Sequence, residues 1–307
     1  MTENLELIFL TDSHGLYMAR AIKNDLLHPF NIKVKRMNGA TVSGLKNPNS
    51  FTAASKDYEK LLSTKKPKNT KIFMQLGEVD CGILLWLKAQ KNGTDVLYEC
   101  DKTIQDYINY VKKLNTLGFD KIILTSPTLP TITDDDDIGE IKSLRRKQIK
   151  ATYRERTDLT LYFNKMLKEA CQLHKIDYID LTEDFLDYKT MLCKERFRNS
   201  NIEDHHMEYD EASIVWAKAI KQYLYRVSDK DQKIVFSKVI KDTYAKQLKK
   251  KSTYIPDKIY PLNIGDTLSY HFIYEKGKYI HVENLHVNGK KIDNSYIFLV
   301  KKHLNNE

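Results

Sequence analysis

The stretch LELIFLTDSHG, which runs from Leu5 to Gly15, predicts the fold of the first part of the chain. Its first six residues are mostly apolar, a polar turn follows, and the apolar residues after Gly15 have helical spacing. A buried run, a tight turn and an amphipathic segment are typical of a strand–turn–helix unit. We therefore expect a strand over Leu5–Leu10 and a helix that starts near Leu16.

Four more strand candidates follow at intervals, and amphipathic segments separate them; Ile32–Met37 alternates with period two, as a strand would. Strands that alternate with helices predict a parallel sheet with helices on both faces. We therefore expect a first domain over residues 1–228 with this α/β organisation. The expected strands are Ile32–Met37, Lys71–Leu76, Lys121–Thr125 and Ile176–Leu181, and the expected helices include Asp101–Leu117, Leu159–His174 and Asp210–Arg226.

Residues 229–307 have a different character and are expected to form a small second domain. A basic helix is expected over Gln232–Lys251, and period-two alternation with turn signals near Gly277 and Gly289 predicts β-hairpins beyond it. The segment holds 15 Lys against 9 acidic residues, so it carries +6 of the total +9. Such a surface is either simply solvated or attracts an anionic partner such as an acidic glycan. No nucleic-acid motif is present, so no specific nucleic-acid partner is expected.

Composition and the N-terminus favour a soluble enzyme or binding module. The four cysteines are scattered without a CxxC pair, which argues against a zinc ribbon and a disulfide scaffold. No run approaches the roughly 20 apolar residues of a membrane helix, and the start of the chain does not resemble a signal peptide. We therefore expect a cytoplasmic protein; the sequence predicts no oligomeric state.

Ser13 occupies a position that suits a nucleophile. It follows a predicted buried strand and precedes a helix, whose free N–H groups favour a developing negative charge. The alternative is that Ser13 only caps the helix, because Ser is a preferred capping residue.

The second chemical feature is a histidine pair far downstream, in the string Glu203-Asp204-His205-His206. A carboxylate two or three residues before His206 can hold its ring so that the imidazole accepts a proton. Glu203 and Asp204 both remain candidates for this role. Two adjacent histidines without a further nearby ligand argue against zinc, so no metal is expected.

These blocks together resemble the SGNH (GDSL-type) hydrolase family, in particular a polysaccharide-associated branch. The resemblance covers about residues 5–226. It is carried by Asp-Ser after the first strand, a glycine loop after the second, Gly-x-x-Asp after the third and acid-x-x-His near the domain end. The resemblance implies a flavodoxin-like three-layer α/β/α sandwich. The whole chain is then this sandwich plus a small, mostly antiparallel C-terminal β domain.

The resemblance also implies roles for single residues. Ser13 is the expected nucleophile and His206 the expected base, with oxyanion donors from the backbone N–H groups of Ser13 and Gly39. Glu78 and Asp80 are expected near the substrate, although Asp80 could instead have a structural role. Where the family pattern has asparagine this chain has Val79, whose side chain has no donor.

The expected function is that of a serine esterase or O-acyltransferase acting on acyl esters, most simply acetyl esters, of a carbohydrate. The reaction would pass through an acyl-serine and needs no cofactor. The partner is then a carbohydrate or an acylated small molecule. The alternative is a catalytically degenerate module that binds a glycan or a partner enzyme.

Overall fold

The computed structural model of the chain describes residues 6–28, 30–47, 49–134, 148–201, 204–228, 234–235, 267–276, 279–287, 290–291 and 297–298. The chain divides into two compact units, of which the first ends at Ala217 and the second begins at Lys218. The predicted domain boundary at residue 228 stays a prediction. Within these ranges, each helix is too short or too polar to span a bilayer.

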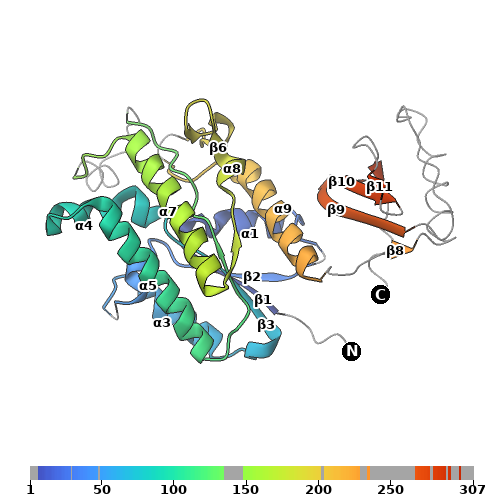
Figure 1. The fold of residues 1–307 in the computed structure, drawn as a ribbon, viewed down its shortest axis with the longest axis horizontal. Helices are drawn as coiled ribbons and strands as arrows, with labels where there is room; N and C mark the ends of the chain where they lie inside the picture. Colours follow the sequence, from blue (N-terminus) through green and yellow to red (C-terminus); the bar gives the residue numbers. More distant parts are fainter. Residues whose placement is uncertain are drawn as a thin grey trace. The chain divides into compact units, whose positions relative to one another are not determined.

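The first unit is built on five parallel strands in the order β2-β1-β3-β4-β5 (Figure 1). This is the flavodoxin-like order, in which the chain begins inside the sheet and reverses direction once. Each predicted apolar run forms one of these strands, so the predicted parallel α/β fold is confirmed. The strands are β1 (Glu6–Thr11), β2 (Ile32–Arg36), β3 (Thr70–Gln75), β4 (Ile122–Thr125) and β5 (Asp177–Ile179), and a separate hairpin holds β6 (Leu186–Asp187) and β7 (Leu192–Cys193).

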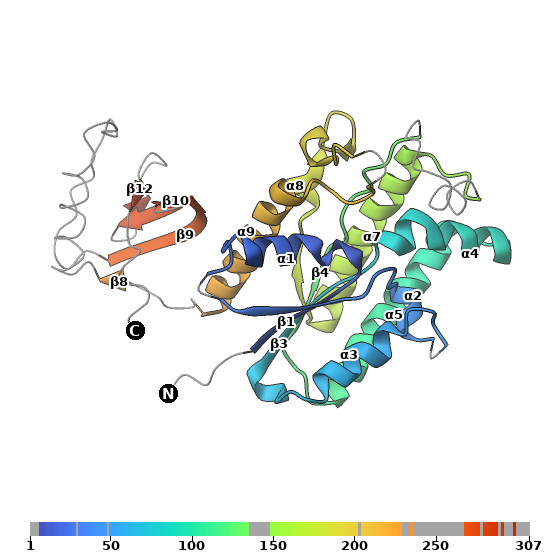
Figure 2. The same cartoon turned by 180° about the vertical axis from the view of Figure 1, so that it is seen from behind.

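Helices cover both faces of the sheet and give three layers (Figures 1 and 2). One face packs against α3, α5 and α7, whose apolar side chains form one core cluster with the strands. On the other face lie α1 and α9, which an ion pair between Arg20 and Asp210 joins. The helices are α1 (Leu16–Lys23), α2 (Val42–Leu45), α3 (Ala54–Leu62), α4 (Leu85–Asn92), α5 (Val96–Thr116), α7 (Tyr153–His174), α8 (Thr182–Phe185) and α9 (Tyr209–Ser228).

Strand β1 shows why short apolar runs make this sheet. Successive side chains of a strand point to opposite faces, so a sheet covered twice needs apolar residues at every position. Ile8 and Leu10 belong to the core cluster beneath α5 and α7. Phe9 points the other way, where the indole of Trp216 in α9 packs edge-on against it with ring centroids 5.6 Å apart.

The topology places three loops at one edge of the sheet. Because β2, β1 and β3 are adjacent and parallel, the segments after their carboxyl ends emerge side by side. These segments carry Ser13 after β1, Gly39 after β2 and Glu78 after β3. This edge is where ligands of open α/β sheets bind.

The second unit contains an antiparallel sheet in the order β11-β10-β9-β8, with β12 paired to β10. The predicted β-hairpins are confirmed, because β9 and β10 flank the predicted turn near Gly277. The predicted helix Gln232–Lys251 is wrong at residues 234–235, which form β8 and pair with β9; the rest of that segment lies outside the described residues. The strands are β8 (Ile234–Val235), β9 (Thr267–Lys276), β10 (Tyr279–Val287), β11 (Lys290–Lys291) and β12 (Ile297–Phe298).

Candidate functional site

Ser13 lies on the turn between β1 and α1. It begins a single 3-10 turn over Ser13–Gly15 that leads directly into the helix. Asp12 caps this turn, because its Oδ1 accepts a hydrogen bond from the N–H of His14 at 2.8 Å. Asp12 and His14 are buried, whereas Ser13 between them is half-buried. Ser13 is therefore the residue of this turn that solvent reaches.

His206 lies in the loop before α9 and is held by a carboxylate. Asp204 Oδ1 lies 2.6 Å from His206 Nδ1 and accepts a hydrogen bond from the His206 N–H at 3.0 Å. The hydroxyl of Tyr209 donates to Asp204 Oδ2 at 2.5 Å. Of the two predicted orienting groups Asp204 makes this contact, and Glu203 lies outside the described residues.

This pairing sets the roles of the two ring nitrogens of His206. An ionised carboxylate can only accept hydrogen bonds, so Nδ1 carries the proton and Nε2 has the free lone pair. Nε2 is buried and has no hydrogen-bond partner among the described residues. An imidazole in this tautomer is ready to take a proton from a neighbouring hydroxyl.

Two contacts fix the histidine loop to the rest of the unit. The N–H of Met207 donates to the hydroxyl of Tyr17 in α1 at 2.6 Å. The hydroxyl of Thr131, which follows β4, donates to the carbonyl oxygen of His205 at 2.8 Å. Since Tyr17 is completely buried, the loop is anchored to a rigid part of the core.

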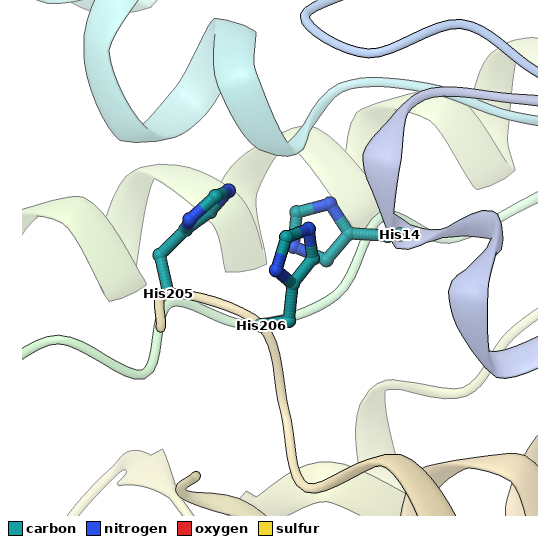
Figure 3. Close-up of side chains that lie close together, drawn as sticks. All are labelled: His14, His205 and His206. Carbon is teal, nitrogen blue, oxygen red and sulfur yellow. The ribbon is translucent and has the colours of Figure 1, made fainter. Parts of the chain in front are cut away.

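The turn of Ser13 and the loop of His206 meet at the carboxyl edge of the sheet. The rings of His14 and His206 pack together with their centroids 4.8 Å apart (Figure 3). The ring of His205 also packs against that of His206, with centroids 4.1 Å apart. His14 directly follows Ser13 in the chain. The structure thus brings together the two segments that the sequence singles out.

Burial and charge adjust the acidity of these groups in opposite directions. Burial lowers the pKa of His206, and the charge of His14 lowers it further, against the smaller influence of Asp204 and Glu78. Burial also lowers the pKa of His14, but the charges of Glu78 and Asp12 outweigh it and the pKa rises. His14 therefore takes up a proton more readily than an ordinary histidine, and His206 less readily.

The carboxylate that orients His206 stays ionised at all ordinary pH values. Burial raises the pKa of Asp204, but hydrogen bonds from the Tyr209 hydroxyl and from the backbone and ring of His206 outweigh it and lower the pKa to about 2. Asp204 can therefore stabilise an imidazolium on His206.

We predict that the ring of His206 titrates below pH 6.5, the ordinary value for histidine, and that His14→Gln moves its midpoint upward. The shift is expected because the substitution removes a positive charge beside His206. NMR titration of the histidine ring protons measures both midpoints, with His28→Gln, an exposed residue after α1, as the control. An unchanged His206 midpoint in His14→Gln would contradict the coupling of the two rings.

Backbone N–H groups at this edge are available to an anion. Gly39 lies in the exposed turn after β2 with φ +71°, a conformation that favours glycine. Among the described residues, the N–H groups of Ser13 and Gly39 donate to no protein acceptor. Both remain candidates for the predicted oxyanion donors.

Asp80 makes structural contacts, and its expected contact with substrate stays a prediction. Its carboxylate is fully buried and accepts hydrogen bonds from Val42 N at 2.7 Å, Ser43 N at 3.3 Å and Ser43 Oγ at 2.9 Å. These donors begin α2, directly after the loop of Gly39. Asp80 therefore holds this loop in place, the alternative that the sequence left open.

We predict that Asp80→Ala lowers the free energy of unfolding by about 2–4 kcal/mol, because three buried donors lose their acceptor. Asp80→Asn keeps one acceptor oxygen, so we expect about half of this loss. Urea unfolding followed by circular dichroism measures both values. Equal stability of Asp80→Ala and the parent would show that the loop does not depend on this carboxylate.

Glu78 and Val79 flank the same edge. Glu78 is buried, and its Oε2 lies 3.9 Å from His14 Nε2. Its expected contact with substrate stays a prediction. Val79 is half-buried and begins the segment that continues into the π-helical turn Asp80–Leu84. Its side chain has no hydrogen-bond donor.

Sequence reasoning missed His14 and Tyr209. A signal for His14 is present, because Asp12-Ser13-His14 has the same Asp-x-His spacing as Asp204-His205-His206. The two Asp-x-His segments fold alike: in each, the aspartate accepts a hydrogen bond from the histidine N–H and lies against Nδ1 of the same histidine. Nothing in the sequence indicates that Tyr209 donates to Asp204.

Comparisons with known proteins give distant likenesses only. No protein-family model matches the chain, and no curated protein does. A GDSL-like lipase from Bacteroides thetaiotaomicron is 13% identical with a TM-score of 0.46, over 74% of this chain and 91% of that one. A carbohydrate acetylesterase from Sinorhizobium meliloti is 13% identical with a TM-score of 0.48, over 72% and 99%. An acetyl xylan esterase is 14% identical with a TM-score of 0.43, over 71% and 99%.

Proposed function

We propose that this chain is an SGNH-type serine esterase that cleaves acyl esters, most simply acetyl esters, of a carbohydrate. Ser13 is the nucleophile, His206 the general base and Asp204 the group that orients the imidazole. The observation that carries the proposal is the Asp204–His206 pair, whose ring packs on the residue after Ser13. The fold supports it, because the pair and Ser13 lie at the edge where such sheets bind ligands.

In the first half of the reaction Ser13 Oγ bonds to the ester carbonyl carbon while its proton passes to His206 Nε2. The carbonyl oxygen becomes negative and accepts hydrogen bonds from the N–H groups of Ser13 and Gly39. When this intermediate collapses, the carbon–oxygen bond to the sugar breaks. The leaving sugar oxygen takes the proton from His206, and the acyl group remains on Ser13.

In the second half an acceptor hydroxyl attacks the acyl-serine. His206 Nε2 takes the acceptor's proton and later returns it to Ser13 Oγ, so the enzyme ends as it began. With water as the acceptor the product is a free acid, and the enzyme is a hydrolase. With a sugar hydroxyl the product is a new ester, and the enzyme is an O-acyltransferase.

Val79 supports a second candidate, a degenerate module that binds a glycan or a partner enzyme without turnover. Removing one oxyanion donor from a working esterase typically costs about 100–1,000-fold in rate. The intact Asp204–His206 pair and the half-buried Ser13 favour the enzyme. A site without catalytic activity would not require an ionised carboxylate against an imidazole.

The test is release of 4-nitrophenol from 4-nitrophenyl acetate and of acetate from acetylated xylan by the full chain. A second reaction contains an excess of unacetylated oligosaccharide, and mass spectrometry detects any acetylated product. Turnover supports the esterase, and transfer to the oligosaccharide identifies the acyltransferase. Rates equal to the background for both substrates would contradict the proposal and favour the binding module.

A further inference from the structure

The strongest unassigned feature of the described residues is a cluster of three imidazoles from His14, His205 and His206 (Figure 3). One nitrogen from each ring can be chosen so that all three lie within 4.8 Å of one another. The proposed reaction uses only one of these rings. The other two need a separate explanation.

We propose that this cluster binds a divalent transition-metal ion such as Zn²⁺. Imidazole nitrogens are common ligands of this ion, and three protein ligands that leave a further position open are a frequent arrangement. The binding itself does not depend on the proposed function.

The second argument is the orientation of two of the rings. Asp12 Oδ1 lies 3.2 Å from His14 Nδ1, and Asp204 Oδ1 lies 2.6 Å from His206 Nδ1. In both residues the carboxylate therefore occupies Nδ1 and leaves Nε2 for a ligand. A carboxylate behind the ring is how proteins usually orient metal-binding histidines. The chain builds this Asp-x-His arrangement twice, from segments far apart in sequence, and the two rings lie with their centroids 4.8 Å apart.

The third argument is an unsatisfied nitrogen. His206 Nε2 is buried and has no hydrogen-bond partner among the described residues. A buried polar atom without a partner destabilises the fold, so a ligand there is favoured. Negative charge lies beside another ring of the cluster, because Glu78 Oε2 lies 3.9 Å from His14 Nε2 and Glu78 is buried.

The three ring nitrogens must move only slightly closer together to coordinate one zinc ion. Zinc–nitrogen bonds of about 2.0–2.1 Å in a tetrahedral site put neighbouring ligand atoms about 3.3 Å apart. The widest pair in the cluster must therefore close by about 1.5 Å. His205 is half-buried, and a shift of its side chain toward the other two rings would close the site.

One consequence rests on the proposed function. A metal ion on His206 Nε2 takes the lone pair that would accept the proton of Ser13. Zinc would then inhibit the esterase by occupying its base, and release of zinc would restore activity. The site would act as a metal-controlled switch on the same residues.

The test uses the full chain, freed of metal with EDTA and titrated with Zn²⁺ in competition with a chromophoric chelator. The variants are His205→Ala and His205→Phe, which keeps a ring but has no nitrogen. The control is His28→Ala, an exposed histidine outside the cluster. We expect both His205 variants to lose one zinc equivalent or bind it at least about 10-fold more weakly, and the control to match the parent. Co²⁺ gives a second readout, because a Co²⁺ ion held by the cluster adds a visible absorption band that the His205 variants lack.

Zinc binding in both His205 variants that equals that of the parent in affinity and stoichiometry would overturn the proposal. Circular dichroism shows whether either His205 variant is misfolded, and the second variant then still tests the loss of the ligand. The ratio of esterase rates with and without zinc, measured within each variant, tests the inhibition. If the parent has no esterase activity but the His205 variants lose zinc, the metal site stands and the proposed function fails.

Discussion

Ser13→Ala is expected to lower kcat/KM for 4-nitrophenyl acetate by about 10⁴–10⁶-fold, because the variant has no oxygen to form the acyl-enzyme. His206→Ala is expected to fall to a similar rate, and the double variant little further. Residues that act as one unit have strongly non-additive effects. Initial rates at a pH above the His206 midpoint measure all three variants.

The matched control for this series is Ser63→Ala. Ser63 is exposed at the end of α3, where its hydroxyl donates to the carbonyl oxygen of Lys60. It should retain the parent rate, which separates loss of the nucleophile from a general effect of removing a serine. A Ser13→Ala variant that keeps the parent rate would mean that another group, or bound metal, performs the hydrolysis.

Asp204→Asn is expected to lower kcat by about 10³–10⁴-fold, because an amide at this position no longer fixes the Nδ1–H tautomer or stabilises the imidazolium. The free energy of unfolding should change much less, since the amide can still accept from the His206 N–H. Steady-state kinetics and urea unfolding on the same preparations separate the two effects.

Glu203→Gln is the matched control for this prediction, because it makes the same chemical change one residue away. We expect it to keep a kcat close to that of the parent. Tyr209→Phe, which removes only the hydrogen bond to Asp204 Oδ2, should have an intermediate effect. If Glu203→Gln loses activity and Asp204→Asn does not, the orienting carboxylate is Glu203.

The central strands could be predicted because they lie between two layers of helices. Such strands need apolar residues at successive positions, so runs like Lys71–Leu76 stand out from the sequence, and all six residues of β3 are buried. Ser13 could be found for the same reason, since it directly follows such a run. The segment at residues 234–235 was misread because a short edge strand and the start of a basic helix have similar composition.

The details of the site depend on contacts that local patterns do not encode. Asp204 and Glu203 are both close enough to His206 in sequence, and only the folded loop shows which carboxylate meets the ring. The partners of Asp80 could not be read either, because Val42 and Ser43 begin α2 and lie far from Asp80 in the sequence. The spacing of His14 to Asp12 is visible in the sequence, but its contacts with Glu78 and His206 join segments far apart along the chain.

The most direct measurement of the central claim, that Ser13 is a nucleophile activated by His206, is covalent labelling with diisopropyl fluorophosphate. After metal is removed, the full chain is treated with the reagent, digested and mapped by mass spectrometry. We expect one diisopropyl phosphate group on Ser13, and a loss of labelling in His206→Ala. Labelling of another residue alone, or equal labelling of Ser13 in both proteins, would contradict the account.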